Sequence, residues 1–208
     1  MFERNEFSEN NLCFINVPAL KKIILITVIL MLSGSYAGAE EYWRLRYFVP
    51  TSDESEITRG TSKASEKLAI SGHSGILVFA NGIGVGYSTI RTSGSLEGIS
   101  YKFKKHSLDL SYTIGSTFSF TLGAGRLIYG RGELDSSGVN YLTERSSGEA
   151  LFMNFGLPFL GGEILLGYRQ NNDEYKNYQS QLNGTAVILA DSVKLFSNQV
   201  NGGFGFLF

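Results

Sequence analysis

NGGFGFLF, residues 201–208, is the most informative part of the sequence for the fold. Phe204, Phe206 and Phe208 stand at every second position there, so in an extended strand their rings share one face. The ends of soluble domains are usually poorly ordered, because an untethered terminus has little to pack against. Rings that continue to the final residue of a strand instead fit a lipid bilayer, in which one strand face touches hydrocarbon.

The same alternation of apolar and polar residues recurs along the chain, whereas convincing helical periodicity does not. One face of each alternating segment is large, apolar and aromatic, and the other carries glycine, serine, threonine and charges. A soluble sandwich would alternate too, but it would need Leu, Ile and Val on its inner face. The sequence therefore predicts an all-β fold, an eight-stranded antiparallel transmembrane β-barrel with a polar lumen. The expected strands are residues 42–49, 82–90, 98–104, 107–115, 117–125, 151–155, 162–169 and 200–208.

Seven charged residues on the polar faces are expected to form a charge network inside the barrel. They are Arg44, Arg46, Lys102, Lys104, Asp109, Glu163 and Arg169. An Arg or Lys on the lipid face near the bilayer midplane costs roughly 2–4 kcal/mol, so turning the first strand over would be unfavourable. Arg126 falls on the outward face near the far end of its strand, where it would meet lipid headgroups.

The connections between the expected strands differ in length. Short ones are expected at residues 92–98, 115–116 and 158–162. Long polar ones are expected at Pro50–Asn81, Gly130–Glu149 and Gln170–Asn198. One tight link, KKHS at residues 104–107, lies on the same side as the long connections. Short turns at one end and long loops at the other are typical of outer-membrane barrels, whose long loops face the exterior.

Two segments fit this scheme less clearly. Asn81-Gly82 is a hairpin signal, but a turn there would add a ninth strand. With both termini on the short-turn side the number of strands must be even. We therefore assign residues 75–84 to an extension of the second strand or to the first loop. Residues 185–196 are ambiguous in the same way, because they are compatible with a loop or with strands that continue above the membrane.

The N-terminal region, residues 1–39, has the three parts of a secretory signal peptide. Lys21 and Lys22 precede an apolar run at residues 23–32, and Ala37 and Ala39 form an A-x-A cleavage site. This run of ten residues is too short for a spanning helix, which needs about 20 apolar residues. Residues 1–20 are interpreted as an upstream extension. The single cysteine lies in it, so the barrel domain at residues 40–208 is expected to have no disulfide.

The C-terminal stretch resembles the β-signal of bacterial outer-membrane proteins. That signal has a polar residue, a glycine, a hydrophobic residue and a terminal aromatic at spacings matched by Asn201, Gly203, Phe206 and Phe208. The resemblance implies the outer membrane of a Gram-negative bacterium and recognition of the last strand by the outer-membrane assembly machinery. By length and strand count, the chain also resembles the small eight-stranded barrels of the OmpX/OmpA type.

Chemical motifs are sparse. The glycine-rich pieces do not spell G-x-G-x-x-G, and the barrel domain has no cysteine and only two histidines, His73 and His106, so neither cofactor nor metal is expected. The lipid A deacylases pair a His with a Ser two residues later. Here Ser74 and Ser107 follow the two histidines directly, which places each pair on opposite strand faces. A non-enzymatic protein is expected, and a lipid A-modifying enzyme stays open as an alternative.

The expected function is structural or adhesive, through the long exterior loops. Six residues in these loops are candidates for partner contacts: Tyr141, Arg145, Glu149, Tyr175, Lys176 and Tyr178. A narrow pore, or a carrier for small hydrophobic compounds, stays open, although side chains just fill an eight-stranded barrel. The expected partners are outer-membrane lipid and lipopolysaccharide, with a monomeric state. A net charge of −1 gives no bulk attraction to nucleic acid.

Overall fold

The computed structural model describes residues 43–60, 62–66, 68–96, 98–115, 118–136, 138–182, 185–189 and 192–208. All of these belong to one compact unit, Ala39–Phe208. The predicted signal peptide at residues 1–39, with its extension at 1–20, lies outside the described residues. No helix in the described part of the chain is long and apolar enough to cross a membrane.

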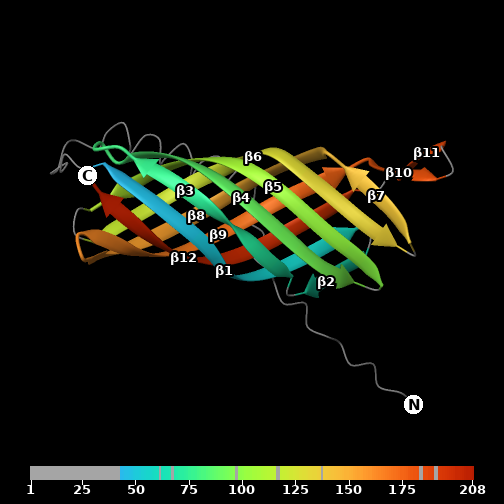
Figure 1. The fold of residues 1–208 in the computed structure, drawn as a ribbon, viewed down its shortest axis with the longest axis horizontal. Helices are drawn as coiled ribbons and strands as arrows, with labels where there is room; N and C mark the ends of the chain where they lie inside the picture. Colours follow the sequence, from blue (N-terminus) through green and yellow to red (C-terminus); the bar gives the residue numbers. More distant parts are fainter. Residues whose placement is uncertain are drawn as a thin grey trace, which may run out of the picture. The chain divides into compact units, whose positions relative to one another are not determined.

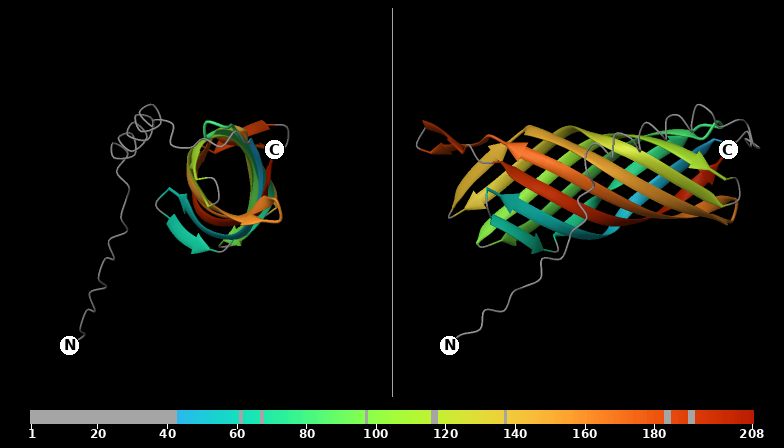
Figure 2. Two further views of the ribbon diagram at one scale, coloured as in Figure 1. Left: turned by 90° about the vertical axis from the view of Figure 1, so that its left-hand side faces the viewer. Right: turned by 180° about the vertical axis from the view of Figure 1, so that it is seen from behind.

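Eight long strands of the described chain form a closed antiparallel barrel (Figures 1 and 2). Seen end on, they make a continuous ring, which the β6–β8 pairing closes. The predicted eight-stranded antiparallel barrel is therefore confirmed. In their order around the ring the strands are β1 (Arg44–Arg59), β3 (Ala69–Val78), β4 (Ile83–Leu96), β5 (Ile99–Ile114), β6 (Ser119–Ser136), β8 (Arg145–Phe159), β9 (Gly162–Lys176) and β12 (Val193–Leu207).

Four short strands extend this ring. They are β2 (Ser62–Glu66), β7 (Val139–Thr143), β10 (Tyr178–Leu182) and β11 (Thr185–Leu189). β2 pairs with β1, β7 pairs with β6, and β10 joins β7 to β11. We call the end of the barrel that holds Trp43 and Phe208 the near end, and the opposite end, which carries these four strands, the far end (Figure 1).

The number of strands was predicted correctly, but only because two errors cancel: one boundary between strands was predicted where none exists, and another was missed. The KKHS segment is not a link, because β5 runs through it without interruption. Asn81-Gly82 is the hairpin turn that the prediction set aside, and it separates β3 from β4. Gly82 has φ = +83°, which favours glycine, and the Asn81 side-chain oxygen accepts a hydrogen bond from the Ile83 amide at 3.1 Å.

The long loops were also predicted wrongly, since most of their residues lie in strands. β1, β6 and β9 continue to Arg59, Ser136 and Lys176, and β12 already begins at Val193. The turn around Gly98 belongs to the far end, whereas the predicted scheme put it at the near end. Outside the lipid the segments no longer follow the apolar-outward pattern, so a rule based on that pattern assigned them to loops.

Two β-bulges change which positions of a strand point into the barrel. The register shifts between Pro50 and Ser52 in β1, and opposite the His106–Ser107 step in β6. In β1, side chains at even positions point into the barrel before the bulge, and those at odd positions point inward after it. Such an extra residue reverses the parity of everything that follows it.

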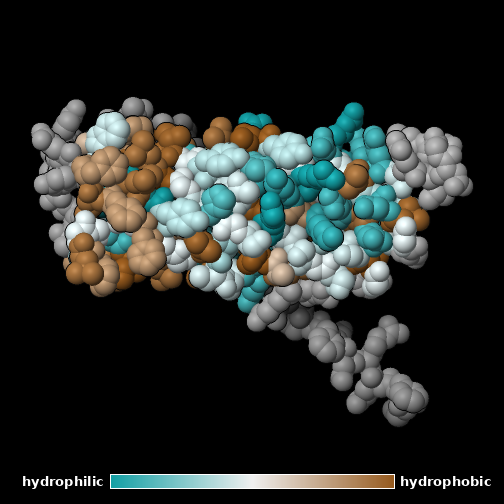
Figure 3. Space-filling model, in the orientation of Figure 1, coloured by the Kyte–Doolittle hydropathy of each residue, from teal (hydrophilic) through white to brown (hydrophobic). Residues whose placement is uncertain are grey.

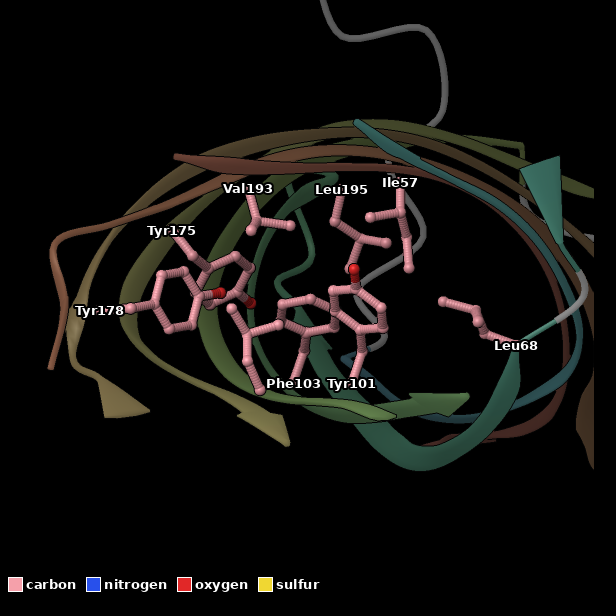
Figure 4. Close-up of a cluster of buried hydrophobic side chains, with 9 residues drawn as sticks. Ile57, Leu68, Tyr101, Phe103, Tyr175, Tyr178, Val193 and Leu195 are labelled. Atoms are coloured by element: carbon pink, nitrogen blue, oxygen red, sulfur yellow. The ribbon is translucent and has the colours of Figure 1, made fainter. Parts of the chain in front are cut away.

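The barrel reverses its polarity along its axis. At the near end the apolar residues point outward, as the band of brown residues in Figure 3 shows. At the far end they point inward and form a buried cluster (Figure 4). Its members are Ile57, Leu68, Tyr101, Phe103, Leu134, Tyr175, Tyr178, Val193 and Leu195. The near half is therefore built for lipid, and the far half is built like a barrel in water.

Candidate functional site

The outer face of the near half carries a continuous apolar surface, which we call the lipid belt. Its side chains are more than a third exposed, for example Leu110 at 58% and Phe204 at 59%. The belt comprises Trp43, Leu45, Tyr47, Val49, Ile83, Val85, Tyr87, Leu108, Leu110, Ile114, Leu122, Met153, Phe155, Leu157, Ile164, Leu166, Tyr168, Val200, Phe204 and Phe206. Soluble monomers rarely expose a patch of this extent, whereas a spanning barrel requires it.

Aromatic and imidazole rings lie at the edge of the lipid belt that faces the far end, on one side of the barrel. Tyr47 stacks on His73 with 6.1 Å between ring centroids, and His106 lies 5.8 Å from Tyr87 and 5.7 Å from Tyr129. We call these five residues the aromatic rim. Amphipathic rings prefer the boundary between hydrocarbon and headgroups, so the membrane-spanning segments end at this level.

The first layer of the lumen is an ion pair between Arg46 and Glu163. Arg46 Nε donates to Glu163 Oε1 at 2.6 Å, and its Nη2 donates to Oε2 at 2.9 Å. Ser119 Oγ donates to the same Oε2 at 2.7 Å, Arg46 also bonds Thr121, and Arg44 Nη1 lies 3.6 Å from Oε2. The carboxylate is thus shared by two arginines and a hydroxyl, which makes burial of its charge tolerable.

A second ionic layer lies further along the lumen, between Arg169 and Asp109. The guanidinium donates twice, from Nη1 to Asp109 Oδ2 at 2.8 Å and from Nη2 to Oδ1 at 2.9 Å. Ser88 Oγ donates to Oδ2 at 2.5 Å, and Arg169 Nε donates to Asn171 Oδ1 at 3.0 Å. This bidentate geometry fixes β9 to β5 across the barrel, 60 residues apart in sequence.

A third ionic layer lies beyond the membrane-spanning segments. Lys105 Nζ donates to Asp173 Oδ2 at 2.6 Å, and Ser55 donates to Asp53 Oδ2 at 2.7 Å. Burial lowers the pKa of Lys105, which the Asp173 carboxylate opposes. Burial likewise raises the pKa of Asp53, against the smaller effects of the Ser55 hydrogen bond and the Lys105 charge.

Asp53→Asn is expected to leave the protein at least as stable at neutral pH, with a gain of no more than about 1 kcal/mol, because Asn keeps the Ser55 bond without a buried charge. A raised folded pKa means that the stabilising contribution of Asp53 is present at acid pH and is lost as pH rises through that pKa. The advantage of the variant should therefore shrink towards about pH 4. Urea unfolding at both pH values measures it, and a clear loss of stability at neutral pH would contradict the assignment.

The structure places five of the seven charged residues predicted for the lumen inside it: Arg44, Arg46, Asp109, Glu163 and Arg169. Lys102 and Lys104 were assigned wrongly, because both point to the outer face. The prediction restarted the alternation at KKHS, whereas β5 keeps one parity throughout. Continued from Asp109, that parity puts Lys105 inside. Lys105, Asp173 and Asp53 are lumen residues that were not predicted.

Side chains fill the lumen of the described barrel. Between the first two ionic layers lies an apolar layer, formed by Phe48, Ile76, Val78, Phe152 and Leu165. A cavity of about 10 Å³ beside this layer has room for about one water molecule. A Cβ at Gly125 would overlap the Asp109 carboxylate, so glycine makes space for the second ionic pair. The geometry therefore does not favour a wide pore.

Only some of the contact residues predicted for the far end are exposed there. Tyr175 and Tyr178 were predicted to touch partners, but both are 0% exposed, and their burial raises the pKa of each phenol. The Phe103 and Tyr175 rings lie 4.8 Å apart in the cluster of Figure 4. Tyr141 packs against this cluster. Three of the predicted contact residues are exposed: Arg145, Glu149 and Lys176.

The two histidines lie on the outer face, and neither contacts a serine within the described residues. Ser107 is buried in the lumen, whereas His106 Nδ1 contacts the Tyr87 hydroxyl and, at 3.1 Å, Thr89 Oγ1. His73 lies directly opposite Thr89 in the register of β3 and β4. In the described chain no three His, Cys, Asp or Glu side chains gather as a metal site would require. The histidines belong to the aromatic rim.

The last strand is tied to the first at the near end. Phe208 N donates to Trp43 O at 3.0 Å, and Trp43 N donates to Phe208 O at 2.9 Å. Asn201 points into the lumen and Phe206 points outward. A Cβ at Gly203 would overlap the backbone carbonyl of Tyr47, so glycine allows the close approach of β1 and β12.

No family model matches the chain, and no curated protein matches it. Among solved structures, it is similar to Neisserial surface protein A, with a TM-score of 0.55 and 13% identity over 81% of this chain and 98% of the other. The attachment invasion locus protein Ail of Yersinia pestis gives 0.46 and 16% over 80% and 99%. The outer membrane protease OmpT of Escherichia coli gives 0.48 and 6% over 81% and 97%. At such low identity the similarity to Neisserial surface protein A is evidence for the fold alone.

Proposed function

We propose that this chain, which has the fold of the small eight-stranded outer-membrane β-barrels, serves in a Gram-negative outer membrane as a rigid support for a binding surface at its far end. An export signal at residues 1–39 and insertion of the last strand by the assembly machinery belong to the same proposal. The far end would face the exterior and bind partners on host cells or matrix.

The main support for this proposal is the reversal of polarity along the barrel, from apolar residues outside at the near end to apolar residues inside at the far end. A barrel that served only to span the membrane would need the lipid belt and a filled lumen. Here the strands continue beyond the belt and bury a second core that includes Phe103, Leu134 and Leu195. Burying such side chains is favourable in water, by about 1.5–3 kcal/mol for each large residue. The far half is thereby an ordered surface that can hold contact residues in fixed places.

No specific observation favours a lipid A-modifying enzyme. Catalysis by a nucleophile and its base requires the two groups within hydrogen-bond reach. Each histidine and the serine after it point to opposite strand faces, and OmpT, although named a protease, is similar to this chain at only 6% identity. A carrier for hydrophobic compounds would need an open lumen, and four side-chain layers occupy it.

The location is tested by membrane fractionation followed by gel electrophoresis with and without heating. The folded barrel should appear in the outer-membrane fraction and migrate differently before and after boiling, because its strand ring resists detergent until heated. A processed chain that is freely soluble without detergent would overturn the proposal, since it could not carry the lipid belt on its surface.

The binding role is tested by shortening the far end in two separate variants. Removal of residues 180–190 truncates β10 and deletes β11, while keeping Tyr178 in its core position, and removal of residues 61–67 deletes β2. Each variant should keep its heat-dependent mobility. At least one should lose most of the binding of expressing cells to host cells or matrix that the parent shows. Unchanged binding in both variants would refute the proposed surface.

A further inference from the structure

Three cations stand side by side on the outer face of the barrel, one on each of three adjacent strands. Arg91 of β4 lies directly opposite Lys104 of β5, and Lys104 lies directly opposite Arg131 of β6. We call these three residues the cationic row. Adjacent strands are about 4.8 Å apart, so the row is roughly 10 Å long. Like charges directly opposite each other destabilise a sheet unless an anion lies between them.

The acidic residues of this face neutralise only one member of the row. Glu133 pairs with Arg131, with Arg131 Nε at 3.1 Å from Glu133 Oε1. Within the part of the chain that the structure describes, Arg91 and Lys104 form no ion pair. The next outward residue on β5 is a further cation, Lys102, which lies opposite Glu133. Two adjacent cations, Arg91 and Lys104, thus have no counterion among the described residues.

The row lies at the height of the lipid headgroups. The His106 position, two residues from Lys104 along β5, belongs to the aromatic rim, and Leu108 and Leu110 of the lipid belt follow. Lys104 is ten residues from Ile114, or roughly 25 Å along the barrel axis at the usual rise and tilt, which is the height of an outer-membrane apolar band. Figure 3 shows the hydrophilic residues of this face beside the brown band.

β1, which lies two strands from β4 around the ring, is different at this height. Outward positions of β1 beyond the belt are Glu54 and Glu56. A ring of cations that only served to reach headgroups would surround the whole barrel. The restriction of the row to β4–β6 indicates one bound molecule at a fixed place.

We propose that Arg91, Lys104 and Arg131 bind the phosphate groups of one lipopolysaccharide molecule, with its acyl chains along the lipid belt below them. Arg binds phosphate oxygens with its planar fork of N–H donors, and Lys binds them as a point charge. A row of roughly 10 Å fits the headgroup of lipid A, which carries two phosphates on a disaccharide, better than a phospholipid with one. The inference rests on the outer-membrane location proposed above.

The test measures the melting midpoint of the folded barrel in zwitterionic detergent, by the loss of heat-dependent gel mobility, as lipid is added. Diphosphorylated lipid A, the same lipid without phosphates, and phosphatidylglycerol are the three probes. A ligand that binds only the folded state raises the midpoint. The double variant Arg91→Gln/Lys104→Gln should need about thirtyfold more diphosphorylated lipid A for the same rise, since each cation near an anionic lipid contributes roughly fivefold.

A matched control exists on the other side of the barrel. Arg145 and Lys176 also lie directly opposite each other, on β8 and β9. Lys176 is eight residues beyond Tyr168 of the lipid belt, or roughly 20 Å above it, out of reach of headgroups. Arg145→Gln/Lys176→Gln removes the same charge and should leave the midpoint rise unchanged.

Each outcome supports or overturns the proposed lipopolysaccharide site. Equal rises with dephosphorylated lipid A, or an unchanged rise in the Arg91/Lys104 variant, would overturn the site. An equal rise with phosphatidylglycerol would overturn its assignment to lipopolysaccharide. If the Arg91/Lys104 double variant fails to fold, Lys104→Gln alone repeats the comparison, with about a fivefold effect expected. A parent chain that forms no heat-dependent folded species would refute the outer-membrane proposal instead, so the two failures are distinguishable.

Discussion

Glu163→Ala is expected to lower the free energy of unfolding by about 3–5 kcal/mol, the usual effect of removing one partner of a buried ion pair. Glu163 is the acceptor for Arg46 and Ser119 and lies 3.6 Å from Arg44. Its loss would leave Arg46, which is 1% exposed, in the lumen of the near half without the carboxylate that it pairs with. The adjacent apolar layer with Phe48 and Leu165 offers Arg46 no carboxylate in exchange.

Equilibrium unfolding in urea, followed by the fluorescence of the single tryptophan, measures this effect. Trp43 is suitable because it lies next to Arg44 on β1 and contacts the Phe79 ring, with centroids 5.3 Å apart. Glu174→Ala is the control, since it breaks an exposed ion pair with Lys176 and should cost at most about 1 kcal/mol. Similar losses in both variants would show that the Glu163 layer does not hold the barrel together.

Phe103→Ala is expected to cost about 3–5 kcal/mol and to act on the far half of the barrel first. Phe103 is 3% exposed, and its ring packs 4.8 Å from that of Tyr175 at the centre of the far core. Truncation would leave a cavity there, since neighbouring rings are held by their strands. The near half should stay folded, because lipid and the first two ionic layers, which link strands across the lumen, stabilise it independently.

Limited proteolysis of the protein in lipid vesicles separates the two halves. In the Phe103→Ala variant the far hairpins should be cleaved much faster than in the parent, while the membrane-embedded fragment persists. Lys102→Ala is the matched control, because Lys102 is the next residue on β5 and points to solvent, so its effect should stay within about 0.5 kcal/mol. Equal cleavage of both variants would mean that the far half is not ordered by its core.

The candidate site was predictable from the sequence only where it depends on one strand at a time. Arg44 and Arg46 could be placed in the lumen because they alternate with Trp43 and Leu45 on a single strand. The partners across the barrel, such as Glu163 for Arg46, could not be found in this way. They are 117 residues apart, and their contact depends on barrel closure and shear.

The local pattern of the chain predicts the inside-out near half, since hydrocarbon tolerates only one polarity and so imposes a strict period of two on segments such as residues 43–49 and 200–208. The point at which that polarity ends follows from how the strands pair. Water accepts both patterns, so beyond the belt the local pattern wrongly predicts a link at KKHS and contact roles for Tyr175 and Tyr178. The continuous parity of β5, the bulges in β1 and β6 and the far core are set by pairing with distant strands, which no local pattern records.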